Sequence, residues 1–265
     1  MKRFAKLFVL FILSAVLLTA PLSALAGEGD QMTGKEIMKK VKERETWEDR
    51  KSTLKNVLIN SQGNKRIREI KQLERDFGNV DKRILIFTYP RDVEGTAFMS
   101  WSYEDKAEDD QWLYLPALGR IRRIAGSDKT DRFMGSDFTY EDLGQRDLDE
   151  DTHTLLREEK VNGEDCYVVE NVPKEEGYMY SKTITWVAKG KWIGLKKEFY
   201  DPKGDLWKVL TVDEYQEIED ILTITKTEMK DLKEEHRTVI EFSNVEYNTG
   251  IRERMFTKRT MERGF

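Results

Sequence analysis

The feature that most constrains this fold is a long succession of short segments in which apolar and polar side chains alternate, with turn residues between them. Alternation with a period of two is typical of β-strands, because successive side chains point to opposite faces of a sheet. The turns include Asn162-Gly163, a strong hairpin signal, and the longer Asp201-Pro202-Lys203-Gly204 and Gln62-Gly63-Asn64. Strands joined by such turns form an antiparallel meander. We expect strands at residues 52–60, 65–75, 82–89, 96–103, 111–115, 119–125, 154–161, 165–172, 179–188, 193–200, 206–216, 222–231, 236–247 and 252–261.

One segment before the strands has a helical pattern. A Thr33-x-x-Glu36 capping box precedes three apolar residues that share one helix face, namely Ile37, Met38 and Val41. This pattern predicts a helix that ends near Trp47.

A second segment, from Gly126 to Thr152, does not resemble a strand. At 27 residues it is too long for an ordinary connection, and loops of this length are usually functional or disordered. Its centre, residues 133–144, offers an Asp N-cap, a short amphipathic stretch and a final glycine, which predict a helical lid over the sheet. A surface loop with a small core of its own is the alternative.

The N-terminus has the anatomy of a cleaved export signal. Lys2, Arg3 and Lys6 precede an apolar stretch from Leu7 to Ala20, and Ala24-Leu25-Ala26 forms a small-residue cleavage site. We expect cleavage after Ala26 and an exported protein in which residues 27–265 form a single domain. An uncleaved membrane anchor is the alternative, because the apolar stretch is almost long enough to span a bilayer.

Charge and motif content argue against several classes of function. Removing the three basic residues of the signal changes the formal net charge from −5 to −8, which argues against a nucleic-acid partner. Cys166 is the only cysteine, so the domain has no internal disulfide, and the two histidines have no neighbours at zinc-ligand spacing. The common hydrolase, protease and nucleotide-binding motifs are absent. We therefore expect no catalytic residues, no metal and no cofactor.

Large apolar and aromatic residues are dense for so charged a chain. On the segment 96–103, Ala97, Met99, Trp101 and Tyr103 share one face, while the other face is mostly small. An open sheet closed by a movable helix leaves space on its concave side, which favours a binding module for an apolar ligand.

Two linked motifs then suggest a family. The run from Asp110 to Ile124, DQWLYLPALGRIRRI, is followed by the run from Phe133 to Leu143, FMGSDFTYEDL. Together they resemble the LolA-like family of outer-membrane lipoprotein-sorting proteins, over about residues 30–265. The resemblance implies a mainly β (α+β) fold, a half-open antiparallel β-barrel with helices covering its concave face, and a hydrophobic cavity for acyl chains.

The function implied by this resemblance is a periplasmic carrier that binds lipid or the acyl chains of lipoproteins for transfer toward the outer membrane. Its partners would be a lipid or an acylated lipoprotein and, as members with these motifs suggest, an exporter of the resistance-nodulation-division (RND) class. Two alternatives remain: a non-transporting accessory protein that docks on such an exporter, and, less favoured, an exported hydrolase. Strand phase and the lid motif predict the following cavity-lining residues: Met99, Trp101, Tyr103, Trp112, Tyr114, Met134 and Phe138.

Overall fold

All thirteen strands that the structure describes belong to one antiparallel sheet. The structure is a computed structural model that describes residues 32–44, 47–104 and 108–265; the predicted export signal lies outside them. The strands are β1 (Asp49–Ile59), β2 (Lys65–Asp76), β3 (Val80–Tyr89), β4 (Ala97–Tyr103), β5 (Asp110–Leu115), β6 (Arg120–Ile124), β7 (Asp151–Val161), β8 (Glu164–Pro173), β9 (Lys182–Ala188), β10 (Gly194–Tyr200), β11 (Leu206–Ile218), β12 (Ile221–Asp231) and β13 (His236–Tyr247). Thirteen of the predicted strands are thus confirmed.

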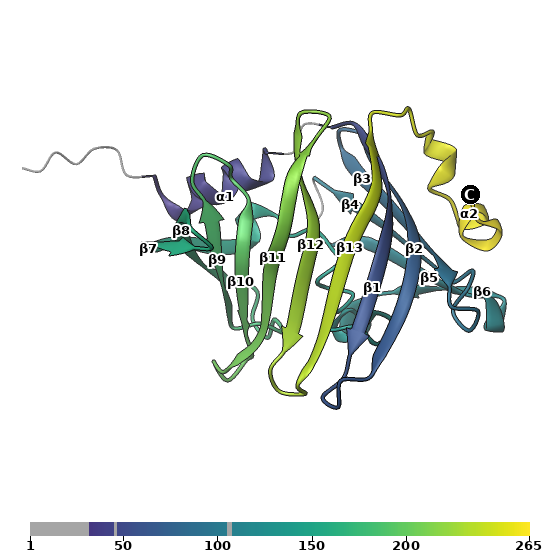
Figure 1. Cartoon of the computed structure of the whole chain (residues 1–265), viewed down its shortest axis with the longest axis horizontal. Coiled ribbons are helices and arrows are strands. Elements are labelled where there is room, and N and C mark those ends of the chain that lie inside the picture. The colour runs from purple at the N-terminus through teal and green to yellow at the C-terminus, as the bar shows by residue number, and fades with distance from the viewer. Residues whose placement is uncertain (1–31, 45–46, 105–107) are drawn as a thin grey trace, which may run out of the picture. The chain divides into compact units, whose positions relative to one another are not determined.

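The order of the strands shows that the sheet is open (Figure 1). It runs β6-β5-β4-β3-β2-β1-β13-β12-β11-β10-β9-β8-β7, so two meanders meet where β1 pairs with β13. The outermost strands, β6 and β7, each pair on one side only, and the sheet therefore stays open. The predicted half-open antiparallel barrel is confirmed.

Strand register shows which elements share a face. One row of directly opposed residues crosses six strands on the same face: Val169, Thr185, Lys197, Leu210, Met229 and Thr238. At one end, Val169 packs against helix α1 (Gly34–Lys42), and at the other Thr238 bonds to the connection between β6 and β7. Both covering elements therefore lie on one face, behind strands β10 to β13 in the view of Figure 1. We call it the concave face.

Helix α1 is held closely against the sheet. The predicted capping box between Thr33 and Glu36 is present, and the buried side chain of Ile37 packs against β8 and β9. A Cβ at Gly34 would lie 2.8 Å from the backbone of His153, so only glycine permits this approach. The helix ends at Lys42, and the prediction that it extends to Trp47 is wrong. No helix in the described parts of the chain is long and apolar enough to cross a membrane.

The C-terminal residues cover the opposite, outer face. The predicted strand at 252–261 is wrong, because this stretch forms a 3-10 turn, η5 (Glu253–Met255), and a short helix, α2 (Lys258–Arg263). Apolar side chains from it pack on β2, β3 and β4 in a cluster that includes Leu73, Ile84, Ile86, Met99, Ile251, Phe256 and Met261. We call this the outer cluster.

The buried Asp49 fixes the start of this C-terminal cover. Its carboxylate accepts hydrogen bonds from the backbone N–H groups of Thr249, Gly250 and Ile251 at 2.8, 2.8 and 3.1 Å. Burial raises the pKa of Asp49, but these hydrogen bonds and that of the Thr249 hydroxyl outweigh it, so the pKa lies below its usual value. The carboxylate thus stays ionised while it caps the turn.

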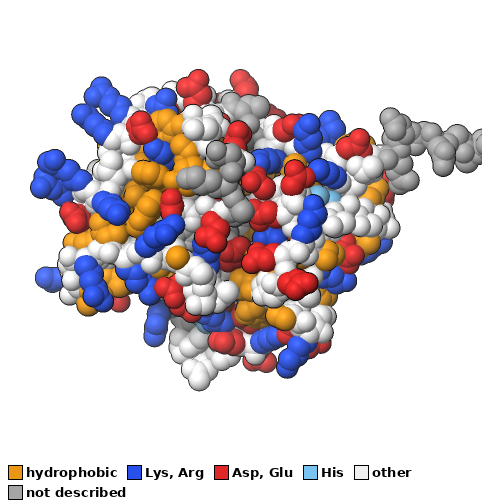
Figure 2. All heavy atoms as spheres, turned by 180° about the vertical axis from the view of Figure 1, so that it is seen from behind, with side chains coloured by type: hydrophobic (Ala, Val, Ile, Leu, Met, Phe, Trp, Pro, Cys, Tyr) orange, Lys and Arg blue, Asp and Glu red, His pale blue; other side chains and the backbone are white. Residues whose placement is uncertain are grey.

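The surface carries charges of both signs. In Figure 2, seen from behind, Lys and Arg side chains alternate with Asp and Glu around patches of hydrophobic side chains. No single-signed field covers this face.

Candidate functional site on the concave face

The connection between β6 and β7, residues 125–150, crosses the concave face from one edge of the sheet to the other. We call it the crossover segment. Its helical elements are three 3-10 turns, η2 (Gly126–Thr130), η3 (Phe133–Gly135) and η4 (Leu148–Glu150), and none is an α-helix, so the prediction of a helical lid is wrong in its conformation. Positive φ angles at Met134 and Gly135, 50° and 73°, break the helix and reverse the chain.

Aromatic packing anchors the crossover segment to the sheet. The ring of Phe133 lies 5.9 Å from that of Phe87 on β3, 5.2 Å from that of Phe98 on β4, and 5.6 Å from that of Tyr140. All four residues are at most 4 % exposed. The alternative of a surface loop with its own core therefore does not hold, because the core is shared with the sheet.

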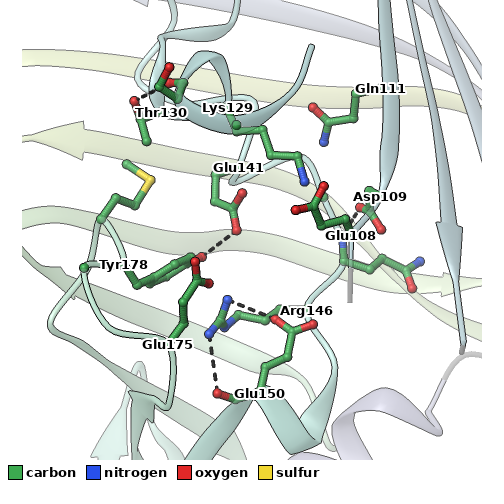
Figure 3. Close-up of a pocket in the computed structure, with 16 residues that line it drawn as sticks. Glu108, Asp109, Gln111, Lys129, Thr130, Glu141, Arg146, Glu150, Glu175 and Tyr178 are labelled. Carbon is green, nitrogen blue, oxygen red and sulfur yellow. Dashed lines mark hydrogen bonds and ion pairs between the residues drawn. The ribbon is translucent and has the colours of Figure 1, made fainter. Parts of the chain in front are cut away.

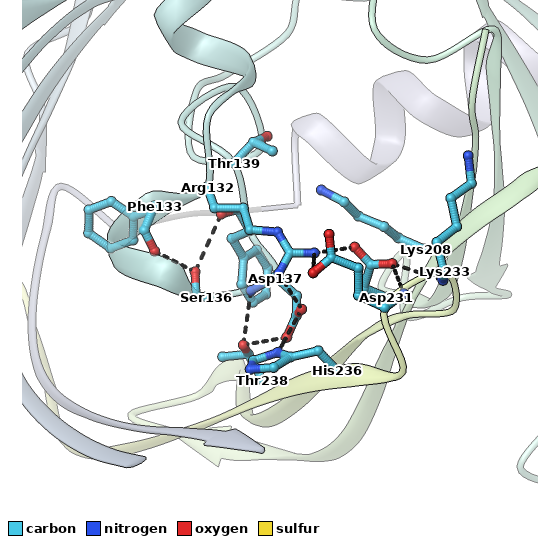
Figure 4. Close-up of polar contacts among 12 residues, drawn as sticks. Arg132, Phe133, Ser136, Asp137, Thr139, Lys208, Asp231, Lys233, His236 and Thr238 are labelled. Carbon is cyan, nitrogen blue, oxygen red and sulfur yellow. Dashed lines mark hydrogen bonds and ion pairs between the residues drawn. The ribbon is translucent and has the colours of Figure 1, made fainter. Parts of the chain in front are cut away.

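A buried polar cluster anchors the same segment to β12 and β13 (Figure 4). Asp137, 0 % exposed, accepts hydrogen bonds from the Thr238 hydroxyl at 2.7 Å and pairs with Nδ1 of His236 at 2.8 Å. Beside it, Arg132 pairs with the buried Asp231 at 2.6 Å. These contacts give Asp137 a structural role.

A second polar anchor holds the segment to β11. Asp142 pairs with Nζ of Lys208 at 3.1 Å and accepts a hydrogen bond from the Tyr180 hydroxyl at 2.8 Å. Lys208 is 1 % exposed, and burial raises the pKa of Tyr180 above its usual range. Ion pairs this deeply buried fix one arrangement, because breaking one would leave an uncompensated charge.

A cavity of about 820 Å³ remains on the concave face between α1, the crossover segment and strands β1 to β4. Met38 and Val41 of α1 and Leu143 and Leu148 of the crossover segment contribute apolar walls. The sheet contributes a polar floor of Arg50, Glu74, Arg83, Ser100 and Ser102. The volume lies within the range of about 300 to 1,000 Å³ that is typical of small-molecule sites.

A smaller pocket of about 300 Å³ is separated from this cavity by residues 144–146, which line both of them (Figure 3). Three of its carboxylates hold the surrounding backbone and side chains. Glu141 accepts a hydrogen bond from the Tyr178 hydroxyl at 2.8 Å, and Asp109 accepts one from the backbone N–H of Gln145 at 2.9 Å. Glu150 forms an ion pair with Arg146 at 3.0 Å. Burial raises the pKa of both Asp109 and Glu150.

The structure does not bring the seven predicted lining residues together. Four of them, Met99, Trp101, Trp112 and Tyr114, belong to the outer cluster beneath the C-terminal residues. Tyr103 follows Trp101 on the same face of β4 and bonds to Asp110. Met134 packs in the aromatic cluster of Phe133, and Phe138 packs near Tyr180 and Phe199. Whether any of the seven contacts lipid stays a prediction.

Sequence reasoning missed the residues that line the cavity on β4. The prediction was that the face of β4 with large apolar side chains lines the cavity. The structure shows that the opposite face, with the small side chains of Ser100 and Ser102, lines it. A site needs space as well as apolar surface, and small side chains supply it. The charged floor residues Arg50, Glu74 and Arg83 carried no motif. Among the described residues, no three His, Cys, Asp or Glu side chains form a metal site.

Known proteins share this architecture. A family model described as an uncharacterized protein matches residues 79–263. A domain of Vibrio parahaemolyticus provisionally assigned to outer membrane lipoprotein sorting is 37 % identical with a TM-score of 0.81, covering 86 % of this chain and 98 % of that one. A DUF1329 family protein from Desulfovibrio piger is 32 % identical with a TM-score of 0.82, covering 86 % and 97 %. None of the curated proteins matches the sequence.

A more distant protein shows how far the fold extends. A LolA superfamily protein from Nitrosomonas europaea is 21 % identical and has a TM-score of 0.67, over 86 % of this chain and 99 % of that one. At this identity the likeness concerns the fold. Together with the two closer structures, it confirms the resemblance predicted from the motifs at 110–124 and 133–143. The chain belongs to the LolA-like family of outer-membrane lipoprotein-sorting proteins, together with the Vibrio parahaemolyticus domain and the DUF1329 protein.

Proposed function

We propose that this protein is a periplasmic carrier that shelters a lipid, or the acyl chains of a lipoprotein, in the cavity beneath α1 for transfer toward the outer membrane. The observation that carries the proposal is the unfilled cavity of about 820 Å³ on the concave face of a LolA-like sheet. The assignment of the Vibrio parahaemolyticus domain to lipoprotein sorting supports the same class of cargo. The export pattern of residues 1–26 supports the compartment.

The cavity also separates the carrier from its first rival, the accessory protein that docks on an RND-class exporter. Such a protein would need no internal space, and its concave face could be filled entirely by its own side chains. Here the crossover segment fills the face near β12 and β13, but the space near α1 is left open. This favours cargo binding, while an exporter remains a candidate partner for loading or unloading.

The second rival, a hydrolase, would have to use the polar pocket of Figure 3. Three of its carboxylates, those of Asp109, Glu141 and Glu150, already accept hydrogen bonds or ion pairs that hold nearby segments in place. This structural use explains their burial without any reaction. We therefore propose a carrier and not an enzyme.

Release of cargo requires a wall that can move. Burial of an acyl chain stabilises the complex by about 0.8 kcal/mol per CH₂ group, or roughly 10 kcal/mol for a long chain. Helix α1 is the weaker wall, because its ion pairs, Lys35 with Asp149 and Lys42 with Asp147, join exposed side chains. Exposed pairs contribute only about 0–1 kcal/mol. We infer that α1, with Ile37 as its main apolar anchor, opens the cavity.

Native mass spectrometry of residues 27–265, purified from an envelope extract, tests this function. We expect a stoichiometric lipid or acylated peptide, which solvent extraction would release for identification. A protein that is free of cargo, and stays so when challenged with acyl lipids and with lipoproteins, would contradict the carrier and favour the accessory protein.

A further inference from the structure

The floor of the cavity holds a row of charged side chains that an acyl chain does not need. Arg50 on β1 lies directly opposite Glu74 on β2, which lies opposite Arg83 on β3, which lies opposite Ser100 on β4. Opposed residues share a face, and all four line the cavity. Buried charges are costly unless they have partners, so a cavity for acyl chains alone gains nothing from this row.

The row has more positive than negative charge. Nε of Arg50 donates to Glu74 at 2.7 Å, and Nη1 of Arg83 lies 3.9 Å from the other carboxylate oxygen of Glu74. The Glu74 side chain is only 12 % exposed, so this carboxylate is held between the two guanidinium groups and shielded from water. The Glu74 carboxylate therefore pairs with two guanidinium groups, and its contact with Arg83 is longer and weaker than its contact with Arg50.

Arg83 is the cation whose charge is least compensated. One of its Nη groups donates to the backbone carbonyl of Leu143, and its buried Nε has no hydrogen-bond partner. Burial lowers the pKa of Arg83, and the attraction of Glu74 does not make up for it. Asp109 acts on Arg83 at longer range, but its carboxylate already accepts from the N–H of Gln145.

The walls around Arg83 suit a molecule that has a polar headgroup and an apolar chain. Ser100 and Ser102 are small and leave space beside the guanidinium group, while Met38, Val41 and Leu143 offer apolar contacts. Guanidinium groups bind carboxylates and phosphates through two parallel hydrogen bonds. We propose that the cargo is an amphiphile with an anionic headgroup, a carboxylate or a phosphate, which binds to Arg83 at the floor of the cavity. This proposal rests on the carrier function above and names the chemical class of its cargo.

A set of single-chain amphiphiles tests the proposal by isothermal titration with purified residues 27–265. The ligands are palmitate, hexadecyl phosphate, hexadecanol and hexadecyltrimethylammonium, with inorganic phosphate as the ligand without a chain. We expect the affinity of the two anionic amphiphiles to be at least about tenfold higher than that of hexadecanol. A charge-assisted hydrogen bond contributes at least this factor to a binding constant. Inorganic phosphate alone should bind far more weakly than hexadecyl phosphate.

The variant Arg83→Met keeps an unbranched apolar stem at this position and removes the guanidinium group with its charge. We expect it to bind the anionic amphiphiles about tenfold more weakly and hexadecanol within about twofold of the unchanged protein. Arg91→Met, an exposed arginine in the β3–β4 turn, is the matched control and should change neither. If Arg83→Met does not fold, Arg83→Lys keeps the charge without the paired donors and should weaken anionic binding to an intermediate degree.

The outcomes separate this proposal from the carrier function. If no amphiphile binds, the carrier proposal fails and this one with it. If amphiphiles bind but show no headgroup preference, or if Arg83→Met weakens all of them equally, the headgroup proposal is overturned while the carrier stands. Preference for the cationic amphiphile, or binding of inorganic phosphate as tight as that of hexadecyl phosphate, would also overturn it.

Discussion

Replacing Asp137 by alanine is expected to lower the free energy of unfolding by about 3 kcal/mol, because the buried groups that pair with its carboxylate would lose their partner. Asp137 is fully buried and joins the crossover segment to β13 through Thr238 and His236. Its own backbone N–H also donates to the Thr238 hydroxyl at 3.0 Å. The variant would leave the buried Thr238 hydroxyl without its acceptor.

Urea denaturation measures this loss, and hydrogen exchange of residues 131–143 shows whether the crossover segment has loosened. The matched control is Asp128→Ala in the same segment, where a half-exposed carboxylate lies 3.6 Å from Arg122. We expect this control to cost less than about 1 kcal/mol. Equal losses in the two variants would show that Asp137 does not anchor the segment.

Replacing Phe133 by alanine is expected to cost about 3–5 kcal/mol, the usual range for removing a buried phenylalanine ring. Phe133 contacts Phe87, Phe98 and Tyr140, so its loss would leave a hole between the crossover segment and two strands. Phe87 and Phe98 lie on two paired strands, β3 and β4, and cannot easily collapse into the hole.

Thermal and urea denaturation of Phe133→Ala test this expectation, with Leu118→Ala as the control. Leu118 is 57 % exposed in the β5–β6 turn, and its truncation should change stability by less than about 0.5 kcal/mol. The crossover segment would be a peripheral loop if Phe133→Ala were as stable as this control.

The fold could be predicted from the sequence because most strands have local signals. Alternation and turn residues such as Asn162-Gly163 mark strands and hairpins without knowledge of distant contacts. The prediction of a strand at 252–261 was wrong, because its apolar residues Phe256 and Met261 pack on the sheet from a turn and a short helix. The pairing of β1 with β13 has no local signal at all, since the two strands are far apart in the sequence.

The site was less predictable because it depends on strand phase and on charges from separate strands. A shift of one residue transfers every side chain of a strand to the opposite face. Trp101 and Ser102 are neighbours in sequence, yet the first packs in the outer cluster and the second lines the cavity. The row of Arg50, Glu74 and Arg83 arises only when three strands pair in register, which no motif encodes.

The same pair of faces offers the most direct test of the carrier. Ser102→Trp adds an indole ring to the cavity, while Tyr103→Trp adds bulk at the next position of β4, on the outer face. Titration with a fluorescent fatty acid measures the affinity of each folded variant. We expect Ser102→Trp to bind about tenfold or more weakly, because the ring occupies space that the acyl chain would fill, and Tyr103→Trp to bind within about twofold of the unchanged protein. Unchanged binding by Ser102→Trp, or a loss caused by Tyr103→Trp alone, would contradict a cargo site on the concave face.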